Sequence, residues 1–311
     1  MIGIVILNYK NYQETISCVE NIRETNQSLS YKIYIVDNCS PNESFEILSE
    51  KFNNSKDICL LQSDKNGGFS YGNNFGFKAA VSDGCELILC TNSDVEFNEN
   101  SIPNMVKEIE KSENCAVVGP KVYCGDGTVQ NANKGILTAK VFVMHHKPFL
   151  WFDWFGTDKK YTYAGYKYDK PIQITGMVSG CCFLIRSAVL EEIGYLDENV
   201  FLYHEEDILG AKLREKGYCV ILDPSAEIVH FGGKSTPSDY AFVRYHKLYS
   251  GLYYLWNYAG TSKCGFAFVG LVVKTMFFAK SIFNKAYRKY YKKLKFDIKN
   301  LRKSKRVFWK K

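Results

Sequence analysis

The first ninety residues alternate between short apolar runs and segments with helical periodicity. The apolar runs have the length and β-branched content of buried strands, and they fall at residues 2–7, 31–36, 58–61 and 86–90. The segments between them have the apolar spacing of amphipathic helices, at residues 12–26, about 40–52 and 71–83. Such alternation predicts βαβ units, so we expect an α/β fold with a mostly parallel central sheet. Ser40 is predicted to cap the second helix, with Pro41 at its first position.

Polar residues follow each predicted strand at its carboxyl end. Asn8 ends the first run, Asp37 the second, a loop at Asn66 the third, and Asn92 with Asp94 the fourth. Right-handed crossovers bring these strand ends to one edge of the sheet, where open α/β sheets bind their ligands. We therefore expect four separate elements to contribute to one site.

The Asn92-Ser93-Asp94 segment is the strongest local signal at that edge. In extended backbone, Asn92 and Asp94 would point to the same side of the strand. An amide oxygen and a carboxylate facing one way are ligands that Mg²⁺ or Mn²⁺ prefers. The alternative is a plain turn at the end of a strand, because all three residue types favour turns.

Two downstream features bear on chemistry. Glu205, Glu206 and Asp207 open a predicted helix, where the helix macrodipole stabilises carboxylates. One of them could act as a general base on an acceptor hydroxyl, although such clusters are also common at ordinary helix starts. His230 follows a strand-like run at 227–229; beside a carboxylate metal site it is a plausible imidazole ligand, and elsewhere it would be an ordinary surface or core residue.

Residues 123–170 lack periodicity and are rich in aromatic side chains, nine of which fall within residues 149–168. We interpret this region as an insertion. It is either a lid that contacts substrate or membrane, or a local aromatic core.

Composition favours a reduced, globular protein. Hydrophobic residues make up 46% of the chain, and its 11 cysteines include no CxxC motif. This usage predicts free thiols in a cytoplasmic protein rather than a disulfide framework. The first residues, MIGIVILNYKN, lack a basic stretch and a cleavage site, so they are predicted to be a strand rather than a signal peptide.

The net charge of +7 is unevenly distributed along the chain. Residues 285–311 carry 13 Lys and Arg against one Asp, a net +12, which leaves −5 on the preceding 284 residues. An apolar set and a basic set recur there at helical spacing: Phe283, Tyr287, Tyr291, Leu294, Ile298 and Leu301 against Lys285, Arg288, Lys292, Lys295, Lys299 and Arg302. This pattern predicts an amphipathic helix on an anionic membrane surface. The alternative is a helix packed on its own domain with a solvated basic face.

An uncharged run precedes this helix, at residues 264–273. It is too short to cross a bilayer, which needs about 20 apolar residues. The sequence therefore predicts a catalytic domain over residues 1–240, with the insertion at about 123–170, and a helical, basic, membrane-associating region over residues 241–311.

Seven stretches, in order, resemble the motifs of family 2 inverting glycosyltransferases with the GT-A fold. The similarity is to the branch that includes rhamnosyltransferases and galactofuranosyltransferases of surface polysaccharides. The stretches are VILNY at 5–9, IVDNCSPN at 35–42, NGGFSYGNNFG at 66–76, TNSDV at 91–95, SGCCFLIR at 179–186, FLYHEEDILGAKLREKGY at 201–218 and residues 230–235. Together they cover roughly residues 1–240.

The resemblance implies roles on the donor side. Asn8 and Asp37 would contact the nucleotide base and ribose, and the Asn66-Gly67-Gly68 loop would close over the nucleotide. Asn92-Ser93-Asp94 stands in place of the family's Asp-x-Asp, with Asn92 instead of the first Asp. That departure leaves Asp94 as the main ligand of Mg²⁺ or Mn²⁺.

The same resemblance implies roles around the acceptor. Glu206 falls at the position of the catalytic base, between Glu205 and Asp207, and Asp207 is the alternative base. Gly180 would border the sugar, His230 would be the downstream metal ligand, and Ser235 would reach a phosphate.

The implied activity is the inverting transfer of a sugar from a nucleotide-diphosphate sugar, dTDP-rhamnose or a UDP-hexose, to a lipid-linked saccharide. O-antigen or capsule synthesis at the inner face of the cell membrane is the implied setting.

A degenerate, non-catalytic glycosyltransferase acting as a scaffold is the alternative, favoured only by Asn92. A nucleotide-dependent oxidoreductase is disfavoured because no GxGxxG follows the first strand. A nucleic-acid-binding role for the basic tail would leave the seven motifs unexplained.

Overall fold

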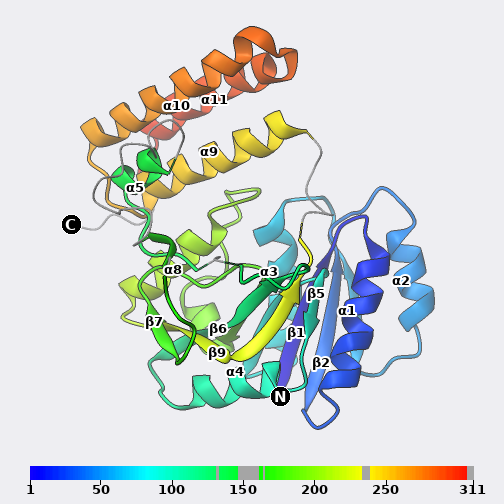
Figure 1. Cartoon of the computed structure of the whole chain (residues 1–311). Coiled ribbons are helices and arrows are strands. Elements are labelled where there is room, and N and C mark those ends of the chain that lie inside the picture. The colour runs from blue at the N-terminus through cyan, green and yellow to red at the C-terminus, as the bar shows by residue number, and fades with distance from the viewer. Residues whose placement is uncertain (131–132, 146–160, 164, 233–238, 307–311) are drawn as a thin grey trace.

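The computed structural model describes residues 1–130, 133–145, 161–163, 165–232 and 239–306. Its centre is one mixed sheet with the strand order β3-β2-β1-β4-β8-β6-β9-β5, and β7 pairs with β9 (Figure 1). The strands are β1 (Ile2–Asn8), β2 (Tyr31–Asp37), β3 (Ile58–Gln62), β4 (Leu87–Asn92), β5 (Val95–Phe97), β6 (Cys115–Cys124), β7 (Ile172–Ile174), β8 (Cys182–Arg186) and β9 (Cys219–His230).

The first four strands of this order are parallel, and β6 is parallel to β9. The β8 strand runs antiparallel between β4 and β6, and β5 and β7 pair antiparallel with β9. The predicted α/β fold with a mostly parallel sheet is therefore confirmed.

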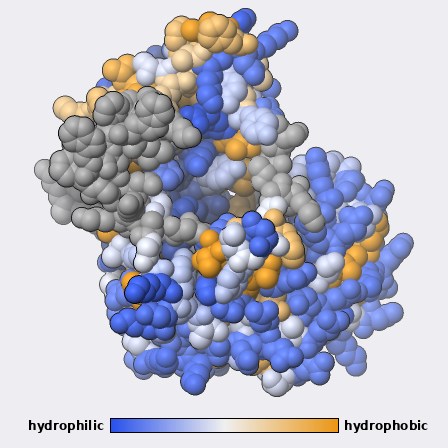
Figure 2. Space-filling view, viewed as in Figure 1, coloured by the Kyte–Doolittle hydropathy of each residue, from blue (hydrophilic) through white to orange (hydrophobic). Residues whose placement is uncertain are grey.

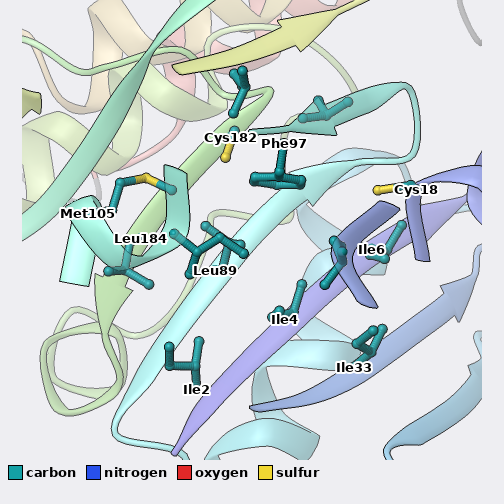
Figure 3. Close-up of a cluster of buried hydrophobic side chains, with 14 of the residues drawn as sticks. Ile2, Ile4, Ile6, Cys18, Ile33, Leu89, Phe97, Met105, Cys182 and Leu184 are labelled. Atoms are coloured by element: carbon teal, nitrogen blue, oxygen red, sulfur yellow. The ribbon is translucent and has the colours of Figure 1, made fainter. Parts of the chain in front are cut away.

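Helices cover both faces of the sheet because the strands alternate apolar side chains between the faces. Ile4 and Ile6 of β1 face one core and Val5 faces the other. Figure 3 shows the first core, in which alternate β1 side chains lie with Phe97 and Met105. Its helices are α1 (Tyr12–Thr25), α2 (Ser44–Phe52) and α4 (Ser101–Glu110). The other face is covered by α3 (Phe69–Ser82), α7 (Ser187–Glu192) and α8 (Glu205–Glu215).

One local prediction was wrong. The α2 helix begins at Ser44 rather than Pro41, because Ser40 is held in the preceding loop. Its N–H donates to Asp37 Oδ1 at 2.8 Å and its Oγ accepts from the Lys10 N–H at 2.8 Å. The strand-like run at 227–229 is confirmed as the end of a longer strand, β9, whose register against β6 shifts after Asp223.

The C-terminal region forms a helical layer beside the sheet-bearing part (Figure 1). It contains α9 (Tyr240–Asn257), α10 (Lys263–Phe283) and α11 (Lys285–Lys303), and the short helix α5 (Ala139–Met144) packs on it. These helices share one apolar core with α8, through residues such as Ile208, Leu252, Phe266 and Leu294. The layer is therefore packed onto the domain that carries the predicted site.

The apolar side of α11 is covered by protein. Tyr287, Leu294, Ile298 and Leu301 are buried in the core shared with α9 and α10. This is the packing that the alternative interpretation of the tail required, and it leaves α11 facing solvent with its basic residues.

The outward apolar surface belongs instead to α10. Phe268, Leu271, Phe278 and Ile282 are each about half exposed or more, at 60%, 55%, 50% and 49%. The helix continues through Lys274 and Lys280, beyond the uncharged run at 264–273, to 21 residues. Its most apolar 18-residue window has a mean hydropathy of 1.7 and is 33% buried, so by length and composition alone α10 could cross a membrane.

Candidate functional site

Parallel pairing brings the predicted site residues to one edge of the sheet. Asn8 lies opposite Asp37 in the β1–β2 register, and Asn92 lies opposite Leu7 in the β1–β4 register. The apolar runs end at the same level, so their polar successors lie side by side. The convergence predicted from strand order is confirmed by this pairing.

Asn8 and Asp37 are fully buried and bind each other. Asn8 Nδ2 donates to Asp37 Oδ2 at 2.7 Å, and Asn8 Oδ1 accepts from Thr15 Oγ1 at 2.9 Å. The other oxygen of Asp37 accepts the Ser40 N–H at 2.8 Å. Since buried polar groups need partners, this network fixes the loops after β1 and β2. Asn8 and Asp37 are therefore buried under the loops that form the predicted edge of the sheet, and they hold these loops in position.

The glycine loop packs directly on the segment that precedes α8. Gly68 has φ +92°, which glycine adopts without steric cost, and a Cβ there would lie 2.1 Å from Phe201 O. The next N–H, that of Phe69, donates to Phe201 O at 3.0 Å. A Cβ on Gly67 would lie 2.3 Å from the Tyr71 ring. Gly68 is therefore required for close packing between the predicted donor loop and the segment that precedes α8, and Gly67 for packing of the loop against Tyr71.

Two residues missed by the sequence analysis hold this loop in place. Asn38 Nδ2 donates to Asn66 Oδ1 and to Gly68 O, both at 3.1 Å, and Asn38 Oδ1 accepts from Ser63 Oγ at 3.1 Å. Asn66 Oδ1 also accepts the Gly68 N–H at 3.1 Å. Asn38 adjoins Asp37 in the sequence, but nothing in that pattern indicated which loop it would bind.

The segment from Asn92 to Asp94 is not extended. Asn92 ends β4, and Ser93 and Asp94 form a turn before β5. The prediction that Asn92 and Asp94 share one side of a strand was therefore wrong. The chain must turn here because β5 leaves β4 to pair with β9. Ser93 and Asp94 are 7% and 8% exposed, at the predicted edge of the sheet.

His230 lies beside Asp94, although 136 positions separate them in the chain. The β5–β9 pairing sets Val95 opposite His230, and the Phe231 N–H donates to Asp94 O at 3.0 Å. His230 Nε2 then lies 3.3 Å from Asp94 Oδ1. The other ring nitrogen, Nδ1, lies 3.0 Å from Gln130 Oε1, a partner that the sequence analysis missed.

This arrangement fits a divalent cation. Gln130 Oε1 accepts from His230 Nδ1, so Nε2 is the ring nitrogen that faces Asp94, where a neutral ring would offer its lone pair to a metal. An imidazole lone pair and a carboxylate that converge, with a hydrogen bond to the outer ring nitrogen, are a familiar metal half-site. No group of three or more His, Cys, Asp or Glu side chains arranged to hold a metal occurs in the part of the chain that the structure describes.

The predicted acidic cluster occupies the first turn of α8. The two residues before it, Tyr203 and His204, have φ of 70° and 65°, a left-handed conformation that costs free energy for residues other than glycine. Such strain persists only where the surroundings enforce it. Here it directs the chain from the glycine-loop contact at Phe201 into α8, so that Glu206 lies in the first turn of the helix.

Glu206 forms an ion pair with Lys134, a residue that the sequence analysis did not single out. Lys134 belongs to the aromatic-rich insertion and is placed by two backbone hydrogen bonds with Met177, of 2.9 and 3.0 Å. Burial disfavours the charged Lys134 ammonium, but the Glu206 and Asp207 carboxylates outweigh it and raise the Lys134 pKa. Gly180 flanks Glu206: a Cβ on Gly180 would lie 4.0 Å from Glu206 Cβ, with nothing nearer.

The three acidic side chains have different environments. Burial, followed by the neighbouring Glu206 charge, raises the pKa of Glu205 to about 8, so this carboxyl keeps its proton at neutral pH. Burial would raise the pKa of Asp207, but the Lys134 charge and the hydrogen bond to His204 Nδ1 at 2.7 Å lower it. Asp207 is thus ionised, and it is hydrogen-bonded to His204. Glu206 is the carboxylate next to Gly180.

Two predictions fall wholly or partly outside the described residues. Ser235 lies there, as do Phe149, Trp151, Phe152, Trp154 and Phe155 of the insertion. Of the later aromatic residues, Tyr161 is buried in the core of the helical layer, and Tyr163, Tyr166 and Tyr168 pack against the sheet core. This described part of the insertion is a local aromatic core.

Solved structures of other proteins share this fold. Solved structures similar to this chain include GalNAc-T7 with UDP, GalNAc and Mn²⁺, which shares 14% identity at a TM-score of 0.58 over 78% of this chain and 48% of that one. The mannosyltransferase PcManGT from Pyrobaculum calidifontis, in complex with GDP-Man and Mn²⁺, shares 13% identity at a TM-score of 0.54, with 96% and 84% covered. TarS from S. aureus in complex with UDP-GlcNAc shares 15% identity at a TM-score of 0.55, with 88% and 70% covered. These similarities show the GT-A fold.

The chain belongs to glycosyl transferase family 2, whose model matches residues 3–194. It is 26% identical over 230 residues to the low-salt glycan biosynthesis hexosyltransferase Agl10 of Haloferax volcanii, covering 71% of this chain and 66% of that protein. It is also 26% identical over 166 residues to the N-acetylglucosaminyl-diphospho-decaprenol L-rhamnosyltransferase of Mycobacterium tuberculosis, covering 52% of this chain and 53% of that one. The chain thus spans between half and two thirds of the length of these relatives.

Proposed function

We propose that this glycosyltransferase moves a sugar, with inversion, from a nucleotide-diphosphate sugar to a hydroxyl of a lipid-linked saccharide. A dTDP-rhamnose or UDP-hexose donor and a role in cell-surface polysaccharide synthesis, such as O-antigen or capsule, are part of the proposal. The names of the two relatives, a hexosyltransferase of glycan biosynthesis and a rhamnosyltransferase of a diphospho-decaprenol substrate, support it. The observation that carries it is the position of Glu206, which borders Gly180 next to the donor-loop contact.

Glu206 acts as the general base. It takes the proton from the acceptor hydroxyl while that oxygen bonds to the anomeric carbon and the bond from that carbon to the nucleoside diphosphate breaks. Attack from the face opposite the leaving group inverts the anomeric carbon, so no covalent enzyme intermediate forms. Lys134 orients the carboxylate through the ion pair, and the left-handed turn at His204 fixes the start of α8.

Asp94 and His230 would hold Mg²⁺ or Mn²⁺, with Asn92 as a further oxygen ligand. When bound, the metal supplies positive charge to neutralise the departing diphosphate. The Gln130 hydrogen bond keeps the His230 ring in the orientation that exposes Nε2 to Asp94. Asn8, Asp37 and the Asn66 loop shape the edge on which the nucleotide would lie, and Ser235 is proposed to reach its phosphate.

The protein is proposed to work in the cytoplasm, peripherally on the inner face of the cell membrane. The basic residues of α11 remain exposed to solvent, and the exposed apolar residues of α10 lie in the same helical layer. Basic residues near an anionic surface and an adjacent apolar face together favour interfacial attachment.

A panel of nucleotide sugars, assayed with the purified full chain, Mn²⁺ and a lipid-linked saccharide acceptor, tests the reaction. Product with the inverted anomeric configuration is expected with one donor, and Glu206→Gln is expected to lose it. A degenerate scaffold would instead give neither transfer nor donor hydrolysis, with or without Mn²⁺.

A further inference from the structure

The α9 helix lies between the sheet-bearing part and the α10–α11 pair (Figure 1), and one of its faces meets the segment that leads to Glu206. A Cβ on Gly251 would lie 2.9 Å from His204 Nε2, so the two elements are in contact. Ser250 Oγ donates to Leu202 O at 2.9 Å in the same interface. This face of α9 therefore borders the proposed acceptor side of the site.

Two cations occupy that same face. Arg244 and Lys247 precede Gly251 by seven and four positions, and residues at such spacings share one side of a helix. Neither side chain has an ion-pair partner among the described residues, and Arg244 Nε is buried without a hydrogen bond. The acidic residue nearest in the chain, Asp239, caps α9 by accepting the N–H groups of Ala241 and Phe242. A buried cationic donor without a partner, as Arg244 Nε is here, is costly, and this cost is removed when an anion binds.

Lys247 has an accessible side chain with protein close around it. Its side chain is exposed, but desolvation by nearby protein, with the Lys134 and Arg244 charges, lowers its pKa against the opposing effect of Glu206. Figure 2 shows a recess between the helical layer and the sheet-bearing part, with hydrophilic surface inside it. An accessible cation enclosed by protein is suited to bind an anion from solution.

The cations form a path from the proposed base toward α10. Lys247 is within electrostatic range of Glu206 and Lys134, and Arg244 is within range of Lys280 on α10. Beyond Lys280 is the helix that carries the exposed apolar residues Phe268, Leu271, Phe278 and Ile282. Glu206, the two cations and the apolar surface of α10 thus follow one another. The reacting hydroxyl, the phosphate groups and the lipid follow one another in the same order in a lipid-linked saccharide.

We propose that Arg244 and Lys247 bind the phosphate groups that join the saccharide of the acceptor to its lipid. This inference rests on the proposed function and extends it by assigning the phosphate-binding residues. The donor phosphates are separately accounted for, since Asp94 and His230 lie at the sheet edge and Arg244 and Lys247 lie on α9. Two cations balance the two negative charges of a diphosphate that is esterified at both ends, and arginine can bind it through two parallel hydrogen bonds.

Farnesyl diphosphate, a short polyprenyl diphosphate, is a direct probe of this site. Its binding to the full chain is measured by calorimetry below its micelle concentration, with farnesol as the uncharged control. Arg244→Gln and Lys247→Gln are each expected to raise the Kd for farnesyl diphosphate by about tenfold to a hundredfold. This is the loss of affinity typical of one charge-assisted hydrogen bond. Binding of farnesol should not change. Lys107→Gln, at an exposed lysine of α4, is the matched control.

A second arm separates this site from the donor site. The titration is repeated with saturating Mn²⁺ and UDP, GDP or dTDP. Farnesyl diphosphate should still bind, and the two variants should keep the wild-type affinity for whichever nucleotide binds. Displacement by a nucleotide, with both variants losing nucleotide affinity, would assign the cations to the donor diphosphate and overturn the inference. It would also be overturned by wild-type affinity in both variants, or by no binding to the wild type. Failure of every nucleotide to bind would count against the proposed function alone.

Discussion

His230 Nε2 lies 3.3 Å from Asp94 Oδ1, and the backbone on both sides enforces this proximity. The pairing of Val95 with His230 and the hydrogen bond from Phe231 N to Asp94 O align the end of β9 with the turn before β5. His230, at the end of β9, thus meets Asp94, in the turn before β5, and both are proposed metal ligands. Gln130 completes the arrangement by accepting from His230 Nδ1.

The first prediction concerns this pair. Asp94→Ala should lower transfer by about a thousandfold or more, because a divalent cation contributes several kcal/mol of charge stabilisation. EDTA should have the same effect on the wild type, and His230→Ala should raise the Mn²⁺ concentration needed for activity. The measurement is transfer rate against Mn²⁺ concentration.

Gln130→Ala offers a related readout of ring orientation. Hydrogen bonds to the outer nitrogen of a metal-binding histidine typically contribute 10- to 100-fold in metal affinity, so half-saturation by Mn²⁺ should shift by about that factor. The rate at saturating Mn²⁺ should recover. Full activity of the wild type in EDTA would remove the metal from the mechanism.

The second prediction concerns the base. Glu206→Gln keeps the shape of the side chain but removes the proton acceptor, so the turnover rate should fall by about 10²- to 10⁴-fold. Donor affinity should be retained, because the proposed donor contacts do not include Glu206. The measurement is kcat together with nucleotide binding. An inactive Asp207→Asn with an active Glu206→Gln would move the base to Asp207, which here is hydrogen-bonded to His204.

The third prediction concerns the buried carboxyl of Glu205. Its pKa is raised to about 8 from an ordinary value of 4.5, so the folded protein holds a proton that the unfolded chain has released between those values. The folded state therefore loses stability as pH rises from about 4.5 to about 8, and this loss is complete above that range. Glu205→Gln mimics the protonated form. It should abolish this part of the pH dependence and raise Tm relative to the wild type most strongly at pH 8 to 9.

Thermal unfolding of both proteins across pH 5 to 9 makes the comparison. Glu192→Gln serves as control, because Glu192 is an exposed carboxylate paired with Lys216 on the protein surface. Parallel Tm curves for wild type and Glu205→Gln would show that Glu205 is ionised in the folded protein at neutral pH.

The sequence predicted those parts of the site that follow from regular structure. Asn8 and Asp37 were found because apolar runs of matching length end at one level in a parallel sheet. Lys134 was not, because its segment has no periodicity and its place depends on one bridge to Met177. The helical start at Ser40 was wrong because the Ser40 Oγ accepts the N–H of Lys10, 30 positions away, instead of capping a helix. Patterns report local periodicity, whereas such contacts form only once the chain is folded.

The last prediction concerns membrane attachment. Removing α10 and α11 would expose the apolar core that they share with α9, including Leu252 and Trp256, so substitutions test attachment more cleanly than truncation. Lys292, Lys295 and Lys299 are exposed on α11, where each lysine near an anionic surface contributes on the order of 1 kcal/mol. Their joint replacement by Gln should weaken binding to phosphatidylserine vesicles by about a hundredfold at low salt.

High salt distinguishes the two contributions to this binding. Charge attraction is screened over about 10 Å at 0.1 M salt, whereas burial of apolar surface is not screened. Phe268→Ser with Leu271→Ser, on the exposed face of α10, should therefore remove the binding that survives high salt. Either set should depress activity on a lipid-linked acceptor far more than on a soluble analogue, because the active site itself is unchanged. If both variants bound vesicles as the wild type does, the α11 lysines would be only solvated surface, and α10 would only pack on its own domain. The acceptor would then have to reach Glu206 without attachment of the protein to the membrane.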